Sequence, residues 1–218
     1  MQLEKNGKEI KEVKINKKTV TIQIENVKIE LDKIVYENNY LYIGKILQDK
    51  DILRLKKENQ NAKNYAYALR LLSRKRYSEF ELRNKLSLHK VNSSQIEEII
   101  NKLKSINLIN DDRLSREIIE EENEKCYGKL HIVMKLESKY LDISKVKEIP
   151  IEEEIRKAKR IIERFIVSKT GDLRNETEFH EEILKQKLFA LLMAKGYELN
   201  DIETAWEEYK HENDFRIY

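Results

Sequence analysis

The sequence predicts a mainly α-helical protein, in which a small antiparallel β domain precedes three tandem three-helix modules in an elongated, curved array. Apolar residues alternate with polar ones before about residue 60 and follow a helical period after it. One spacing of four apolar residues then occurs three times in the helical part. We expect a β-rich domain at 1–60 and helix-turn-helix-like modules at 61–110, 111–150 and 151–218.

The β domain is predicted from period-two stretches. TVTIQIENVKIEL places Val20, Ile22 and Ile24 on one side of a strand and continues the alternation after Asn26. NNYLYIGKIL is rich in tyrosine and isoleucine and begins with a pair of asparagines that predicts a turn. Alternating β-branched and aromatic residues are typical of half-buried antiparallel strands, so we expect strands in both stretches.

Helix starts are marked by capping signals after residue 60. A Ser or Asn followed three residues later by Glu satisfies the first amides of a helix. Three segments match this pattern, namely Ser78 to Glu81, Ser94 to Glu97 and Asn200 to Glu203. Pro150 followed by three acids predicts a fourth start. We expect the first helices of the three modules at 62–76, 111–126 and 152–168.

The three modules share one apolar spacing of four, five and five residues. The positions are Leu82, Leu86, Val91 and Ile96, then Ile132, Leu136, Leu141 and Val146, then Leu188, Leu192, Tyr197 and Ile202. A four-spaced pair, a short turn and a capped second helix describe a helix-turn-helix-like unit. The third module contains an inserted segment, SKTGDLRNETE, which we expect to be a flexible linker.

Positive charge is concentrated in one part of a nearly balanced chain. The net charge is +3, yet residues 62–90 contain eight Lys or Arg and two Glu. On a helical wheel one side of 62–76, which we expect to be buried, carries Tyr65, Ala68, Leu69 and Leu72. The opposite side carries Lys63, Tyr67, Arg70 and Arg74. Such a face suits phosphates and bases or an acidic protein surface, and a plain solvated face explains it equally well.

The order of these segments resembles the RecX family of bacterial recombination regulators over residues 62–210. The resemblance is carried by the Leu-Leu-Ser-Arg run that ends at Leu82, by the turn at 108–111, by Tyr127-Gly128 and by Gly196-Tyr197. The chain departs from the family at Tyr140, where a glycine often precedes the next apolar residue.

The resemblance implies a non-enzymatic regulator that binds the RecA recombinase filament in its groove and inhibits its ATPase and strand exchange. It also implies weak contact with single-stranded or double-stranded DNA. We expect a cytoplasmic monomer without a cofactor. The residues expected to contact the filament or DNA are Lys63, Tyr67, Arg70, Arg74, Arg76, Arg83, Lys85, Lys90, Lys135, Lys139, Lys187 and Lys195.

Catalytic, metal and membrane functions have little support in the sequence. The four histidines lack metal-ligand spacing, and Cys126 is the single cysteine. No glycine-rich phosphate loop is present, and no apolar run is long enough to cross a membrane. We therefore expect no catalytic residues, no metal site and no membrane partner.

Two other functions remain open. A helix-turn-helix transcriptional regulator would place the helix that begins near Ser94 in the major groove of DNA. Its sequence, SQIEEIINKLK, carries two early acids that would face phosphates. A passive helical-repeat scaffold is the third reading, and it predicts no DNA binding.

Overall fold

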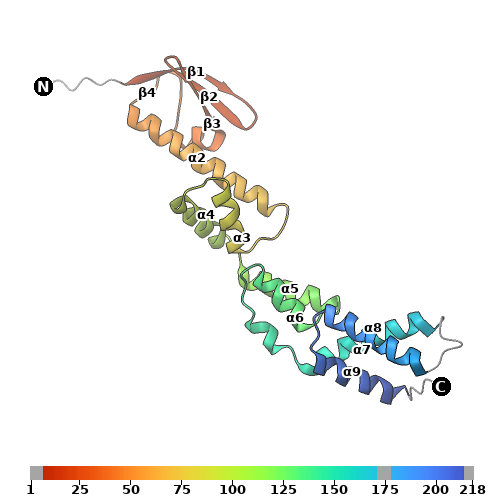
Figure 1. Ribbon diagram of the computed structural model, residues 1–218. Coiled ribbons are helices and arrows are strands. Elements are labelled where there is room, and N and C mark those ends of the chain that lie inside the picture. The colour runs from red at the N-terminus through yellow and green to blue at the C-terminus, as the bar shows by residue number, and fades with distance from the viewer. Residues whose placement is uncertain (1–6, 171–177, 214–218) are drawn as a thin grey trace. The chain divides into compact units, whose positions relative to one another are not determined.

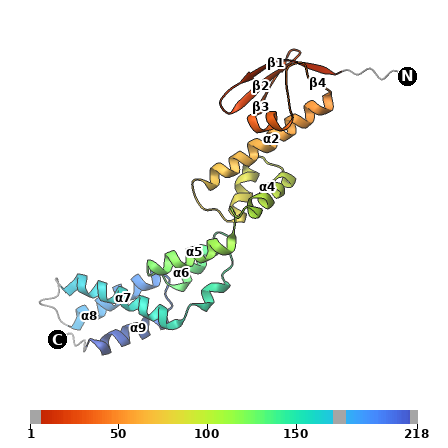
Figure 2. The same cartoon turned by 180° about the vertical axis from the view of Figure 1, so that it is seen from behind.

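The computed structural model describes residues 7–170 and 178–213 (Figure 1). They divide into two compact units. Unit 1 contains the described residues up to Tyr77 together with Leu82–Leu108, and unit 2 contains Ser78–Glu81 together with the described residues from Ile109 onward. The predicted fold class is confirmed, since an antiparallel sheet near the N-terminus is followed by helices (Figures 1 and 2).

Unit 1 begins with a four-stranded antiparallel sheet of order β3-β2-β1-β4. The strands are β1 (Lys8–Ile15), β2 (Thr19–Ile24), β3 (Val27–Asp32) and β4 (Ile46–Leu47). The alternating residues Val20, Ile22 and Ile24 are buried as predicted, and they pack with Val35 and Leu55 of two helices. These helices are α1 (Lys33–Asn38) and α2 (Asp49–Leu72), and Figure 1 shows both beside the sheet.

The structure differs from the sequence prediction between the sheet and residue 60. NNYLYIGKIL forms only the two-residue strand β4, and the helix predicted at 62–76 begins at Asp49 and ends at Leu72. The early start has a local cause, because the Asp51 carboxylate accepts a hydrogen bond from the Gln48 amide at 3.1 Å. Asn59 then ties α2 to the edge of β3, accepting from the Asp32 amide and donating to the Glu30 carbonyl. The helix therefore belongs to the β domain and to the helical part of unit 1.

The helices that follow α2 are α3 (Glu79–Leu88) and α4 (Ser93–Ser105). The predicted capping box is confirmed at α3. The Ser78 backbone amide donates to the Glu81 carboxylate at 3.1 Å, and the Glu81 backbone amide donates to the Ser78 hydroxyl at 3.2 Å. The box predicted at Ser94 is wrong, because Asn92 is the last extended residue and its side chain accepts from the Gln95 amide. Asn200 is likewise inside its helix, and Glu198 is the N-cap.

Unit 2 contains α5 (Asp111–Glu124), α6 (Lys129–Glu137), the 3₁₀ helix η1 (Ser144–Glu148), α7 (Ile151–Thr170), α8 (Glu178–Ala194) and α9 (Leu199–Glu212). Helices α7, α8 and α9 lie against one another in both views (Figures 1 and 2). The capped helix predicted in the second module is only the five-residue η1, because Pro150 follows closely and begins the next helix. The predicted linker lies mostly outside the described residues.

The threefold apolar repeat is present in the structure. All twelve of its positions are buried. Each middle helix ends in the same turn, with positive φ at Lys90, Tyr140 and Gly196. In each turn the next amide donates to the carbonyl five residues earlier, at 3.1, 3.0 and 3.2 Å. This shared turn explains the four-five spacing, while the module boundaries at 60, 110 and 150 stay a prediction.

A second structural feature, the capping of one helix by an acid of a later helix, occurs twice within unit 2. The Asp111 carboxylate accepts from the Glu79 amide at 2.9 Å, and the Glu154 carboxylate accepts from the Lys129 amide, also at 2.9 Å. In both cases an acid in or near the first turn of a later helix caps the start of an earlier helix, where the dipole favours negative charge. Positions 79 and 129 are 50 residues apart, as are the first two copies of the repeat.

Candidate functional site

The basic face predicted on α2 is exposed in unit 1. Lys63 and Arg70 face solvent on α2, while Ala68 is fully buried on another side of the helix. Arg74 is also exposed, but the helix ends at Leu72, so this residue lies in the turn after α2 and not on its face as predicted. The helical wheel was wrong in placing Leu69 on the buried side, because 36% of this residue is exposed. The buried side is partly polar instead, because Asn64 donates to the Gln95 side chain of α4 at 3.0 Å.

Tyr67 holds the middle of this face in place. Its ring stacks on His89, just after the end of α3, with ring centroids 4.0 Å apart, and the Arg70 guanidinium carbon lies 5.4 Å from the same ring centroid. A cation near an aromatic face is stabilised by the ring quadrupole. The tyrosine therefore positions Arg70 and is only half-exposed itself.

The other predicted contact residues of unit 1 differ in exposure and in ion pairing. Lys85 and Lys90 are exposed, and Arg76 is exposed just beyond the end of α2. Arg83 instead forms a two-bond ion pair with Glu97, in which Nη2 lies 2.9 Å from the carboxylate. The pair fixes Arg83 against α4, so the exposed cations are better placed to meet a partner.

Most of the predicted contact residues of unit 2 already interact with other side chains of the protein. Lys135 donates to Glu122 at 2.6 Å, and Lys139 donates to Glu81 at 3.0 Å. The Lys195 ammonium lies 4.4 Å from the centroid of the Tyr127 ring, and Lys187 is exposed on α8. These four lysines belong to unit 2, whereas the α2 cations belong to unit 1.

Glu122 is a buried charge that the sequence analysis missed. Its side chain is 2% exposed, and it receives hydrogen bonds from Lys125 at 2.9 Å and from Lys135. His131 Nε2 lies 3.1 Å from its other oxygen. Glu122 belongs to a run of acids, yet Leu114, Ile118 and Glu122 follow one another at four-residue spacing on the buried side of α5. That position on an apolar stripe was the available signal.

The Glu122 carboxylate makes the stability of unit 2 depend on pH. Burial raises the pKa of this carboxyl, but the hydrogen bonds from Lys135 and Lys125 outweigh burial and lower the pKa to about 2. A lowered pKa in the folded state contributes stability above the ordinary value of about 4.5, and this contribution is lost as the pH falls toward 2. We expect Glu122 to account for a loss of about 2 kcal/mol between pH 5 and pH 3.

Urea unfolding of the wild type and of Glu122→Gln at both pH values measures this contribution. The wild type should lose about 2 kcal/mol more than the variant, because only the wild type takes up this proton. Equal losses would show that Glu122 is not held ionised in the fold.

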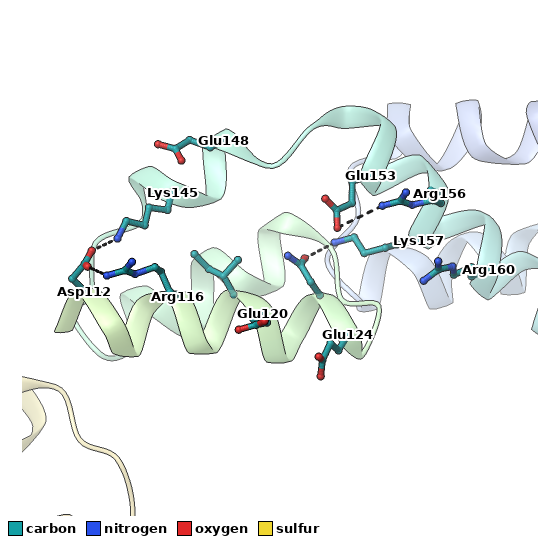
Figure 3. Close-up of a pocket in the computed structure, with 12 residues that line it drawn as sticks. Asp112, Arg116, Glu120, Glu124, Lys145, Glu148, Glu153, Arg156, Lys157 and Arg160 are labelled. Carbon is teal, nitrogen blue, oxygen red and sulfur yellow. Dashed lines mark hydrogen bonds and ion pairs between the residues drawn. The ribbon is translucent and has the colours of Figure 1, made fainter. Parts of the chain in front are cut away.

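A groove of about 710 Å³ crosses unit 2 between α5, η1 and α7 (Figure 3). Asp112 pairs with both Arg116 and Lys145 at one end, and Lys157 donates to Asn123 at 2.8 Å at the other. Acids and bases thus alternate along its walls. Over the described ranges, no three His, Cys, Asp or Glu side chains are grouped to hold a metal ion. None of the helices in those ranges has the length and apolar character needed to span a bilayer.

Residues 65–103 match the family model for the first three-helix domain of RecX. The chain is 31% identical over 153 residues to the regulatory protein RecX of Caldanaerobacter subterraneus subsp. tengcongensis, a match that covers 68% of this chain and 70% of the relative. The chain belongs to the RecX family. The regulatory protein RecX of Lactococcus lactis subsp. lactis is 30% identical over 195 residues, which are 86% of this chain and 70% of that RecX.

The RecX fold is also shared. A crystal structure titled regulatory protein RecX aligns with a TM-score of 0.65 at 22% identity, over 92% of this chain and 99% of that one. The segment that matches the first RecX domain contains most of the basic face, including Tyr67, Arg70 and Arg74. The family match and the exposed cations therefore coincide in the second half of α2 and in α3.

Proposed function

We propose that this RecX-family protein binds the RecA recombinase filament and inhibits its ATPase and strand-exchange activities without catalysing a reaction itself. The observation that carries the proposal is the exposed basic face of α2 and the turn after it, formed by Lys63, Arg70 and Arg74. Arg70 and Arg74 lie within residues 65–103, the segment that matches the first RecX domain. The relatives are named regulatory proteins, and that name supports regulation as the activity.

The physical basis is a match of charge. A filament assembled on DNA presents protein surface and phosphate together, and exposed cations interact favourably with both. Tyr67 and His89 hold Arg70 on its helix, so part of the ordering cost of binding is met before the partner arrives. A regulator that occupies such a surface acts by binding alone.

A sequence-specific helix-turn-helix function receives less support. The early part of α4 would have to read base edges. Gln95 is the amide best suited to adenine there, but it is 8% exposed and bonded to Asn64 and Asn61. Glu97 and Glu98 are exposed in the same turn and would repel phosphates. A passive scaffold stays possible only if neither DNA nor the filament is bound.

Reversing two charges of the face tests the proposal. We expect Arg70→Glu with Arg74→Glu to weaken co-sedimentation with RecA filaments about tenfold or more, which corresponds to about 1.4 kcal/mol. Both side chains are exposed, so the free energy of unfolding should change by no more than about 0.5 kcal/mol.

Lys50→Glu with Lys57→Glu is the matched control, because it makes the same charge change at exposed positions of α2, the helix that carries Arg70. Filament affinity should remain close to that of the wild type. A folded Arg70 and Arg74 variant that binds as well as the control would remove this face from the interface.

A further inference from the structure

The two edges of the sheet in unit 1 are treated differently by the fold. At the β3 edge, the Asn59 side chain of α2 accepts a hydrogen bond from the Asp32 amide at 2.6 Å and donates to the Glu30 carbonyl at 2.9 Å. An uncovered strand edge presents free backbone groups to any other strand, and proteins usually cover it or keep it short. Asn59 thus takes up the outward-pointing backbone groups at the end of β3.

The opposite edge, along β1, is open over residues 11–15. The two-residue strand β4 pairs only with Lys8 and Glu9 (Figure 1), and two further bonds on this side join the segment before β4 to Ile10. Within the described part of the chain, no strand pairs with this side of β1 beyond that point. The side chains of the open stretch are exposed except for the half-buried Val13. This stretch of β1 is therefore available to a further strand.

The hydrogen-bond pattern of the sheet determines which backbone groups point out of this edge. In an antiparallel pair, residues that bond to the partner strand alternate with residues whose backbone groups point away from it. The hairpin between β1 and β2 closes with a bond of 2.8 Å from the Asn16 amide to the carbonyl at the start of β2. Counting back from that bond, Lys14 and Glu12 bond to β2. The amide and carbonyl groups of Val13 and Ile15 therefore point to the open side.

A second copy of β1 fits this edge in one register better than in the others. Two copies pair antiparallel about a twofold axis, and their outward-pointing residues must lie opposite one another. With the axis at Val13, each Glu12 lies opposite the other copy's Lys14, which gives two ion pairs. With the axis at Lys14, the two Lys14 side chains oppose one another and repel. An axis at Ile15 extends the pairing into the turn after β1 and loses both ion pairs.

The apolar side chains of β1 agree with this register. Ile15 lies on the same face of the strand as Val13, and it is 63% exposed although its β2 partner Val20 is fully buried. With the axis at Val13, Ile15 lies diagonal to Val13 of the second copy, on the face that packs over the core. Pairing would therefore cover apolar surface that a single copy exposes to water.

We infer that two copies of this protein associate through β1, as an antiparallel strand pair centred on Val13 that joins their two sheets into one. The inference replaces the expected monomer with a weak dimer, because a short strand pair with two ion pairs buries little surface. It goes beyond the proposed function, since it requires no recombinase. Either proposal can fail while the other stands.

Sedimentation equilibrium of the full-length protein tests the inference at concentrations from about 10 μM to about 1 mM, the range in which weak dimers form. The apparent mass of the wild type should rise from the monomer value of 26.2 kDa toward twice that value. Glu12→Lys and Lys14→Glu should each weaken association about tenfold or more, because each change turns two ion pairs into two like-charge contacts.

Exchange of the two charges identifies the register. The double variant Glu12→Lys with Lys14→Glu should dimerise about as well as the wild type, because opposite charges face one another again. An equimolar mixture of the two single variants should form a mixed dimer for the same reason. Both results follow only if position 12 of one copy faces position 14 of the other.

The matched controls are Lys28→Glu and Glu30→Lys, which make the same charge changes at exposed positions of β3. Both should dimerise as the wild type does, and thermal unfolding of every variant separates loss of pairing from loss of fold. Three results would overturn the inference: a wild type that stays monomeric across the range, controls weakened as much as the β1 variants, or a double variant or mixture that fails to restore association.

Discussion

Replacing Gly128 with alanine is expected to destabilise unit 2 by about 3 kcal/mol, because one methyl group would enter a backbone-to-backbone contact. Gly128 has a φ of −78°, which any residue adopts, so conformational strain is not the cause. A Cβ atom there would overlap the Gly196 carbonyl and lie 2.7 Å from the Tyr197 amide nitrogen. Backbone atoms cannot move aside as a flexible side chain can, so the two turns would have to separate.

Separation of these turns would break further bonds. The Gly128 amide donates to the Lys195 carbonyl at 2.9 Å, and the Leu130 amide donates to the Gly196 carbonyl at 3.0 Å. The Tyr197 hydroxyl donates to the buried Cys126 carbonyl at 3.0 Å. Urea unfolding monitored by circular dichroism measures the loss.

Gly44→Ala is the control for this substitution. Gly44 has a positive φ of 90°, but a Cβ there would meet only the Glu9 carboxylate, at 3.8 Å. The expected cost is the conformational one alone, about 1 kcal/mol. If Gly128→Ala cost no more than this control, the close approach of the two turns would be refuted.

Replacing Lys157 with methionine is expected to cost 3–5 kcal/mol, or roughly the penalty for leaving a buried charge without its partner. Lys157 and Glu154 are 3% and 1% exposed and form an ion pair. The Lys157 ammonium also donates to Asn123 at 2.8 Å and to the Tyr127 carbonyl at 2.9 Å, so it joins α7 to the end of α5. Methionine has a similar length and supplies none of these donors.

A double-mutant cycle identifies the cause of that loss. Glu154→Gln removes the charge that Lys157 balances, so Lys157→Met should cost less in the Glu154→Gln background than in the wild type. The free energies of unfolding of the four proteins give the coupling directly. Additive costs would show that the pair acts through packing and not through charge.

The repeat could be predicted from the sequence because buried positions follow from hydrophobic spacing. Leu86, Leu136 and Leu192 are fully buried, and the turn after each follows the same hydrogen-bond pattern. Spacing does not reveal which residue caps the start of a helix, since neighbouring polar residues compete for that position. Asn92 took that position at α4 in place of Ser94.

Other differences arose where tertiary contacts override local pattern. Residues 49–60 were assigned to the β domain, yet they begin a helix whose Asn59 is fixed by the edge of β3. Leu69 has the period of a buried residue but lies at the rim of a groove beside α4. The exposed cations of α2 could be predicted from the wheel, whereas the pairing of Arg83 with Glu97 depends on the packing of α3 against α4.

The measurement that tests the central claim most directly is the DNA-dependent ATPase rate of the cognate RecA with the purified protein added well below one molecule per recombinase. A regulator that binds the filament should suppress the rate at these ratios, and Arg70→Glu with Arg74→Glu should relieve the suppression. An unchanged ATPase rate up to equimolar protein, with correctly folded protein and intact filaments, would contradict the proposed function.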